Sequence, residues 1–114
     1  MTLGAFSVSL AVTDVDRSAQ FYEKLGFRVI DGGHTSTDFP DNDQHRWRIL
    51  QNGGARIGLF QGMFDNNLLS FAPQDLERVR SELKNNGALD ETAAEEGAII
   101  IKDPDGNAIL FDAH

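Results

Sequence analysis

Apolar and polar residues alternate at the start of the chain, and the pattern then changes its period. Between residues 6 and 12 every second residue is apolar, which is typical of a half-buried β-strand. From Val15 onward the apolar positions recur every three or four residues, as on one face of an α-helix. Asp14 and Asp16 are candidate N-caps, and Gly26 stands where a left-handed residue commonly ends a helix. This stretch predicts a strand, a short turn and a helix.

Similar patterns predict the remaining elements. A second helix is predicted where Leu76, Val79 and Leu83 share one face behind Asp75. Residues 31–44 are rich in Gly, Asp, Asn and Ser and predict a long loop. Further strands are predicted where short apolar runs are bounded by turn-forming residues. They span residues 27–30, 45–51, 55–61, 68–72, 88–92, 97–102 and 108–112.

The two predicted helices belong to two similar halves of the chain. Asp14 and Asp75 are 61 residues apart, and so are Gly26 and Gly87. One half alone has a single apolar sheet face and one helix, too little for a good core.

We therefore predict an α+β fold with one domain over residues 1–114, built from two β-α-β-β-β repeats at about 4–61 and 67–114. The repeats would form an eight-stranded, cup-like mixed sheet with the helices on its outer face. Whether they pair within one chain or by exchange between two chains is left open.

Composition and charge narrow the classes of function. A net charge of −8 argues against nucleic acid as a partner, because binding to phosphates needs clustered Lys and Arg. The absence of cysteine excludes disulfides, thiolate metal ligands and a cysteine nucleophile. No apolar run approaches the roughly 18 residues of a membrane helix, so no membrane association is predicted. The N-terminus lacks the features of a signal peptide, and we expect a cytoplasmic protein.

Two motifs resemble those of a known family. They are AVTDVDRSxxFYxxLGF at residues 11–27 and KDPDGNxIL at residues 102–110. Together with the paired repeats they resemble the vicinal oxygen chelate superfamily, which includes glyoxalase I, the bleomycin-resistance proteins and extradiol dioxygenases. The resemblance spans nearly the whole chain, but its motifs are helix caps and turns, so it implies the fold more than a function.

The resemblance also implies where a metal would be bound. Enzymes of the family typically hold a divalent ion in the cup, with one His or Glu ligand from each of four strands. The matching positions in this chain are Ser7, Gly58, Leu68 and Leu110. None of them offers the imidazole or carboxylate that a catalytic divalent ion prefers. We therefore predict that the usual metal site is absent and that no cofactor is bound.

Strand alternation predicts which side chains would line the cup. Trp47 is either a stacking platform for a ligand or a core residue. Arg56 either binds an anionic group or is a solvated residue at the rim. No catalytic residue is identified. The predicted ligand-binding residues are Ser7, Ser9, Trp47, Arg56, Phe60, Leu68 and Leu110.

The other candidate groups lack the spacing of a functional site. The histidines are scattered, the acidic residues of the long loop do not match a calcium loop, and the acidic pair near the C-terminus is typical of a turn. These residues are His34, His45, His114, Asp38, Asp41, Asp43, Asp103 and Asp105.

The leading hypothesis is a metal-independent small-molecule binding protein of the glyoxalase/bleomycin-resistance type. It would hold an unidentified small apolar or aromatic molecule, and the missing ligands favour binding without turnover, although enzymatic activity is left open. One alternative is a metal-dependent lyase or isomerase with relocated ligands such as His34, His45 or the aspartates of the long loop. Another is a dimeric interaction scaffold with a filled cup. We expect a homodimer, because an isologous contact would cover sheet edges.

Overall fold

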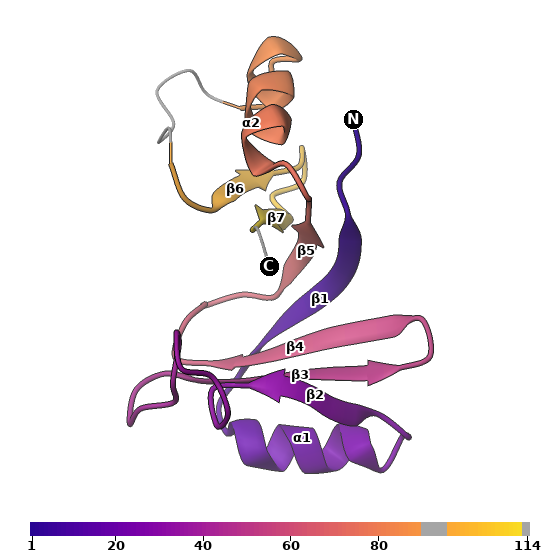
Figure 1. Cartoon of the computed structure of the whole chain (residues 1–114), viewed down its shortest axis with the longest axis vertical. Coiled ribbons are helices and arrows are strands. Elements are labelled where there is room, and N and C mark those ends of the chain that lie inside the picture. Colours follow the sequence, from indigo (N-terminus) through magenta and orange to yellow (C-terminus); the bar gives the residue numbers. More distant parts are fainter. Residues whose placement is uncertain (90–95, 113–114) are drawn as a thin grey trace. The chain divides into compact units, whose positions relative to one another are not determined.

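The computed structural model describes residues 1–89 and 96–112, which form seven strands and two helices (Figure 1). The strands belong to a mixed sheet, so the predicted α+β class is confirmed. No helix in the described ranges is long and apolar enough to cross a membrane. The elements are β1 (Ala5–Val12), α1 (Val15–Glu23), β2 (Arg28–Gly32), β3 (Arg46–Asn52), β4 (Ala55–Gln61), β5 (Leu68–Ala72), α2 (Leu76–Asn85), β6 (Ile99–Lys102) and β7 (Ala108–Phe111).

The eighth strand, predicted at residues 88–92, is not confirmed. Ala88 and Leu89 lie in a bend directly after α2, where the N–H groups of both donate to the carbonyl of Leu83. Leu89 is buried in the core beneath the helix, so its apolar character reflects helix packing and not a strand. The rest of the predicted strand lies outside the described residues.

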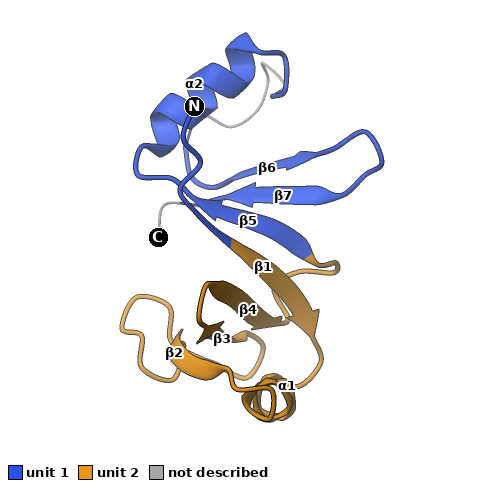
Figure 2. Cartoon of the chain, turned by 90° about the vertical axis from the view of Figure 1, so that its right-hand side faces the viewer, with its two compact units in different colours: residues 1–6, 68–114 blue, residues 7–67 orange. Residues whose placement is uncertain are grey.

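Two compact units make up the chain (Figure 2). Unit 2 comprises residues 7–67, and its strands lie in the order β2-β3-β4-β1. β4 pairs with β1 in parallel and with β3 in antiparallel orientation. Helix α1 covers one face of this sheet. The buried core between them consists of Val15, Ala19, Leu50 and Leu59.

Unit 1 comprises residues 1–6 and the described part of 68–114. Its strands lie in the order β5-β7-β6, with β7 parallel to β5 and antiparallel to β6. Helix α2 covers one face, as α1 does in unit 2. The buried core residues are Val79, Leu83, Leu89, Ile99 and Phe111.

Both helices begin and end as the sequence predicts. Asp14 and Asp75 are the N-caps, and each side chain accepts the backbone N–H three residues later. Both helices end in a Schellman motif, with Gly26 and Gly87 in the left-handed conformation at its C′ position. The apolar spacing from Val15 onward also predicts Leu25 on the buried face of this helix. Leu25 is instead 57% exposed, because the helix ends at Glu23 and the chain leaves the buried face.

The acidic pair near the C-terminus forms the predicted turn. Asp103 Oδ1 accepts the N–H groups of Asp105 and Asn107, and Asp103 Oδ2 accepts the side-chain amide of Asn107. The hydrogen bonds from Asn107 lower the pKa of the Asp103 carboxyl. The side chain of Asp103 is therefore engaged in holding the hairpin between β6 and β7.

Candidate functional site

Five of the seven predicted ligand-binding residues share one face of the unit 2 sheet. Leu59 on β4 is buried against α1, so the residues that alternate with it on β4 project from the opposite face. In the strand register Ser9 pairs with Gly58, and Trp47 pairs with Phe60. We call this the open face of unit 2; from the predicted set it contains Ser7, Ser9, Trp47, Arg56 and Phe60.

Two aromatic rings lie side by side on the open face. Trp47 and Phe60 are cross-strand neighbours with ring centroids 6.5 Å apart and ring planes only 8° from parallel. Phe64 packs edge-on against Phe60, with centroids 5.3 Å apart. Trp47 is partly exposed and belongs to neither core cluster, which favours a platform over a core residue. Parallel neighbouring rings offer a flat apolar surface to a planar molecule.

Arg56 and the serines supply the polar part of this face. Arg56 is exposed, and its Nε and Nη2 atoms donate to Gln51 Oε1 at 3.3 and 2.9 Å. This partner is a neutral amide, so it orients the guanidinium without neutralising its charge. Ser7 is half-buried, and Ser9 is only 4% exposed. The face thus combines a cation with an aromatic surface.

The other two predicted residues, Leu68 and Leu110, lie in unit 1. Leu110 pairs with Ser70 on β5, two residues after Leu68, so both leucines project from the sheet face opposite α2. Leu68 is buried and Leu110 is half-buried. Ser70 shares this face with both leucines and is also buried.

The residues at the four family ligand positions do not fit a divalent metal. Gly58, Leu68 and Leu110 have no side-chain donor, and the hydroxyl of Ser7 is a poor substitute for imidazole or carboxylate. The space at Gly58 is also occupied, since an added Cβ would lie 2.5 Å from Phe60 Cε2 and 3.3 Å from Ile49 Cδ1.

The alternative ligands proposed from the sequence are not brought together either. His34 and His45 are exposed, and His114 lies outside the described residues. Among the described residues, no group of three or more His, Asp or Glu side chains is placed to hold an ion.

The packing of Phe60 over Gly58 makes a testable prediction. Gly58→Ala is expected to cost about 1–3 kcal/mol of stability, because the added methyl group overpacks against the Phe60 ring. In a Phe60→Ala background the same substitution should cost much less, since the ring is gone. Urea unfolding of the four proteins measures both costs. Equal costs in the two backgrounds would show that Phe60 does not occupy this space.

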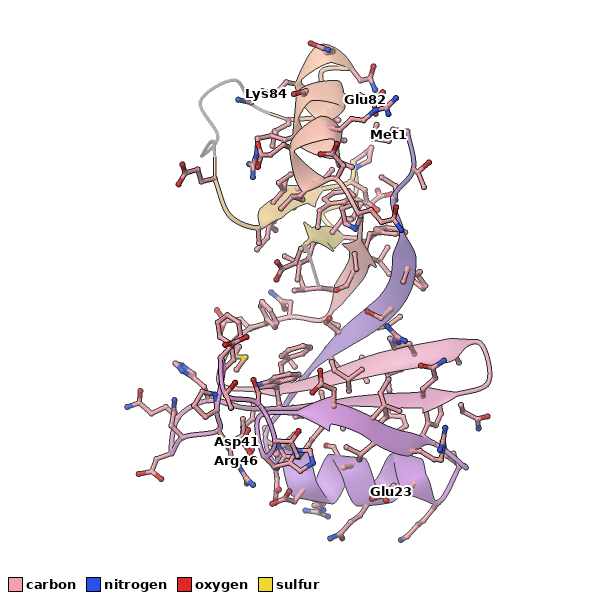
Figure 3. The ribbon with its side chains drawn as sticks, in the orientation of Figure 1. Met1, Glu23, Asp41, Arg46, Glu82 and Lys84 are labelled. Carbon is pink, nitrogen blue, oxygen red and sulfur yellow. The ribbon has the colours of Figure 1, made fainter. Side chains whose placement is uncertain are left out.

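The sequence pattern missed a charged cluster on the other side of the same sheet. Arg48 lies on the α1 face of β3 and is 7% exposed. Its Nη1 atom donates to Asp41 Oδ2 at 2.7 Å, and Arg46 Nη2 lies 3.1 Å from Asp16 Oδ2. Figure 3 shows Asp41 and Arg46 next to each other beside α1. Asp41 is half-buried, whereas the loop aspartates Asp38 and Asp43 are exposed to solvent.

The environment of Asp41 favours its charged form. Burial alone would raise the pKa of this carboxyl, but the hydrogen bonds from Arg48 and the Trp47 N–H lower it. The positive charges of Arg48 and Arg46 act in the same direction, and the pKa of Asp41 is lowered overall. One signal in the sequence could have revealed this pair. Arg48 lies two residues from Leu50 on the same strand and therefore on the same buried face, and a buried arginine needs an acidic partner.

Comparisons with known proteins agree with the fold. A family model described as the Glyoxalase/Bleomycin resistance protein/Dioxygenase superfamily matches residues 4–111. A search of curated protein sequences found no match.

Several solved structures resemble the chain. A methylmalonyl-CoA epimerase from Mycobacterium tuberculosis has a TM-score of 0.68 at 19% identity, covering 99% of this chain and 91% of its own. A superfamily member from Vibrio splendidus 12B01 has a TM-score of 0.62 at 15% identity, covering 96% and 97%. A hypothetical protein from Bacillus halodurans C-125 has a TM-score of 0.66 at 14% identity, covering 99% and 94%. The chain belongs to the Glyoxalase/Bleomycin resistance protein/Dioxygenase superfamily.

Proposed function

We propose that this chain binds a small planar aromatic molecule on the open face of unit 2, without a metal at the family's ligand positions. The observation that supports it most directly is the parallel pair of rings, Trp47 and Phe60, on a partly exposed sheet face. Stacking on an aromatic side chain contributes roughly 1–3 kcal/mol, as measured for nucleic-acid bases. Small-molecule sites typically combine such an apolar surface with a few polar groups.

Arg56 suggests that the ligand has an anionic group. It lies four residues before Phe60 on β4, and the two Cα atoms are therefore about 13 Å apart at roughly 3.3 Å per residue. An elongated molecule of two or three fused rings with an acidic group at one end would contact both residues.

The comparisons support the scaffold of this proposal and leave the ligand open. At 19% identity, the similarity to methylmalonyl-CoA epimerase shows a shared fold only. The residues at the ligand positions favour binding without metal-dependent turnover. Association into a homodimer and a cytoplasmic location stay predictions from the sequence.

Anthraquinonesulfonate, a planar aromatic anion, is a suitable probe. It is expected to quench the emission of Trp47, the single tryptophan, because it would stack on that ring. By calorimetry, Phe60→Ala should weaken its binding by about tenfold or more, which corresponds to about 1.4 kcal/mol. Arg56→Gln should weaken the binding of anthraquinonesulfonate several-fold, because this anion interacts with the positive charge of Arg56. The binding of the neutral hydroxymethylanthraquinone should not change.

Phe21→Ala is the matched control for Phe60→Ala. Phe21 is an exposed aromatic residue on α1, on the other side of the unit 2 sheet, so its removal should not change the affinity. Quenching no stronger than that of free N-acetyltryptophanamide would refute the proposal. An unchanged affinity of Phe60→Ala would do the same.

A further inference from the structure

Residues 33–45 are fastened to strand β3 at Trp47. The N–H of Gly33 donates to the Trp47 carbonyl at 3.0 Å, and the Trp47 N–H donates to Asp41 Oδ1 at 3.3 Å. The Asp41 N–H in turn donates to the Gly33 carbonyl at 3.0 Å. A Cβ atom on Gly33 would overlap Asp41 Oδ1, so only glycine permits this approach. Both backbone groups of Trp47 are thus bonded to this segment beyond the end of β2.

Arg48 holds Asp41 from the α1 side of the sheet. Its guanidinium donates through Nη1 both to Asp41 Oδ2 and to the Trp47 carbonyl, each at 2.7 Å. Arg48 Nη2 lies 3.8 Å from Asp16 Oδ1 in the first turn of α1. Because the side chain of Arg48 is 9% exposed, water competes little for these bonds. The segment is therefore anchored to buried structure on the side opposite the open face.

The same segment contacts the indole ring of Trp47. Trp47 Nε1 donates to the carbonyl of Phe39 at 2.8 Å, and Phe39 lies two residues before Asp41. The position of this carbonyl consequently depends on where Asp41 holds the chain. The hydrogen bond restricts the rotation of the indole, whose plane is nearly parallel to that of Phe60.

We infer that Asp41 and Arg48 are positioning residues for Trp47: their ion pair holds residues 33–45 so that the Phe39 carbonyl fixes the indole ring beside Phe60. Residues 33–44, which belong to the predicted long loop, then form a fixed wall next to the ligand surface. The effect on ligand affinity rests on the proposed function. The effect on the indole does not, because it concerns the protein without ligand.

Asp41→Asn tests the effect on the indole directly. Asparagine keeps an oxygen that can accept the Trp47 N–H, but it removes the charge that pairs with Arg48. Without ligand, we expect a red-shifted Trp47 emission and a near-UV circular dichroism signal reduced by about half or more, since the indole gains rotational freedom and contact with water. Asp43→Asn, an exposed aspartate of the same segment, should leave both spectra unchanged.

Far-UV circular dichroism shows whether each variant keeps its fold. Arg48→Met is a second variant, for which we expect the same spectral changes. If Arg48→Met does not fold, the spectra of Asp41→Asn, the smaller change, decide the test. Folded Asp41→Asn with wild-type Trp47 spectra would overturn the inference.

A double-mutant cycle tests the route through the indole N–H. Trp47→Phe keeps an aromatic ring at this position but has no N–H to bond Phe39. In the wild-type background Asp41→Asn should weaken anthraquinonesulfonate binding by about fivefold or more. In the Trp47→Phe background it should change the affinity by less than about twofold, because coupled residues are not additive.

The two proposals can fail separately. Equal losses of affinity in both backgrounds would overturn the inference, because Asp41 would then act by another route. If the wild-type protein does not bind the probe, the proposed function fails, and the spectra of Asp41→Asn still decide whether Asp41 positions the indole.

Discussion

Replacing Asp41 by alanine is expected to lower the free energy of unfolding by about 3 kcal/mol. The substitution leaves the guanidinium of Arg48 buried without its nearest carboxylate. Removing one partner of a buried ion pair costs about 3–5 kcal/mol. The loss should lie at the lower end, because Arg48 keeps its bond to the Trp47 carbonyl and the more distant Asp16. Urea unfolding at neutral pH measures it.

Asp43→Ala is the control, since this carboxylate is exposed and its removal should change stability by no more than about 0.5 kcal/mol.

The difference in the free energy of unfolding between wild type and Asp41→Ala should also depend on pH. Asp41 has a lowered pKa in the folded protein, so its contribution is complete above the unfolded value of about 3.9. It is lost as the pH falls through the lower, folded value. A neutral-pH loss below about 1 kcal/mol, or a gap that does not narrow in acid, would contradict the prediction.

Local sequence patterns predicted much of the fold because they reflect local physics. An aspartate at an N-cap and a glycine at C′ act through hydrogen bonds within a few residues, so Asp14, Asp75, Gly26 and Gly87 mark the helices whatever surrounds them. Strand alternation likewise fixes which residues share a face once the strand exists. The open-face set follows from this rule, and the strand register agrees with it.

The local sequence patterns could not predict contacts between side chains whose pairing depends on the path of the chain. The partnership of Arg48 with Asp41 depends on how residues 33–45 turn back onto β3, and no local rule determines that path. The same limit applies to Leu89, which falls in a predicted strand and instead packs beneath α2. In both cases a tertiary contact decides the role of the residue.

The aromatic pair occupies a face on which the resemblance implied metal ligands. Where the family's enzymes typically place a glutamate, this chain has Gly58, and the ring of Phe60 fills the space above it. The absence of a side chain at residue 58 is therefore coupled to the presence of an aromatic side chain at residue 60. This coupling explains why the face is better suited to stacking than to coordination of a cation.

Leu59→Ala is expected to lower the free energy of unfolding by about 3 kcal/mol. Leu59 is fully buried at the centre of the unit 2 sheet, between Leu10 on β1 and Arg48 on β3 in the strand register. It packs against Leu50 and Val15, so its removal leaves a cavity between the sheet and α1. Neighbours fixed in strands and a helix cannot easily collapse into that space. Urea unfolding measures the loss.

Leu59→Met is the control, because methionine has a similar volume and should cost less than about 1.5 kcal/mol. If Leu59→Ala cost no more than Leu59→Met, the helix would have moved to fill the cavity. The core would then be adaptable. In that event Arg48, which neighbours Leu59 across the strands, would also change its position relative to Asp41. If α1 stays in place, the emission of Trp47 should remain unchanged in Leu59→Ala. Urea unfolding of this variant then measures the loss of core packing, and its Trp47 emission shows whether residues 33–45 are still anchored.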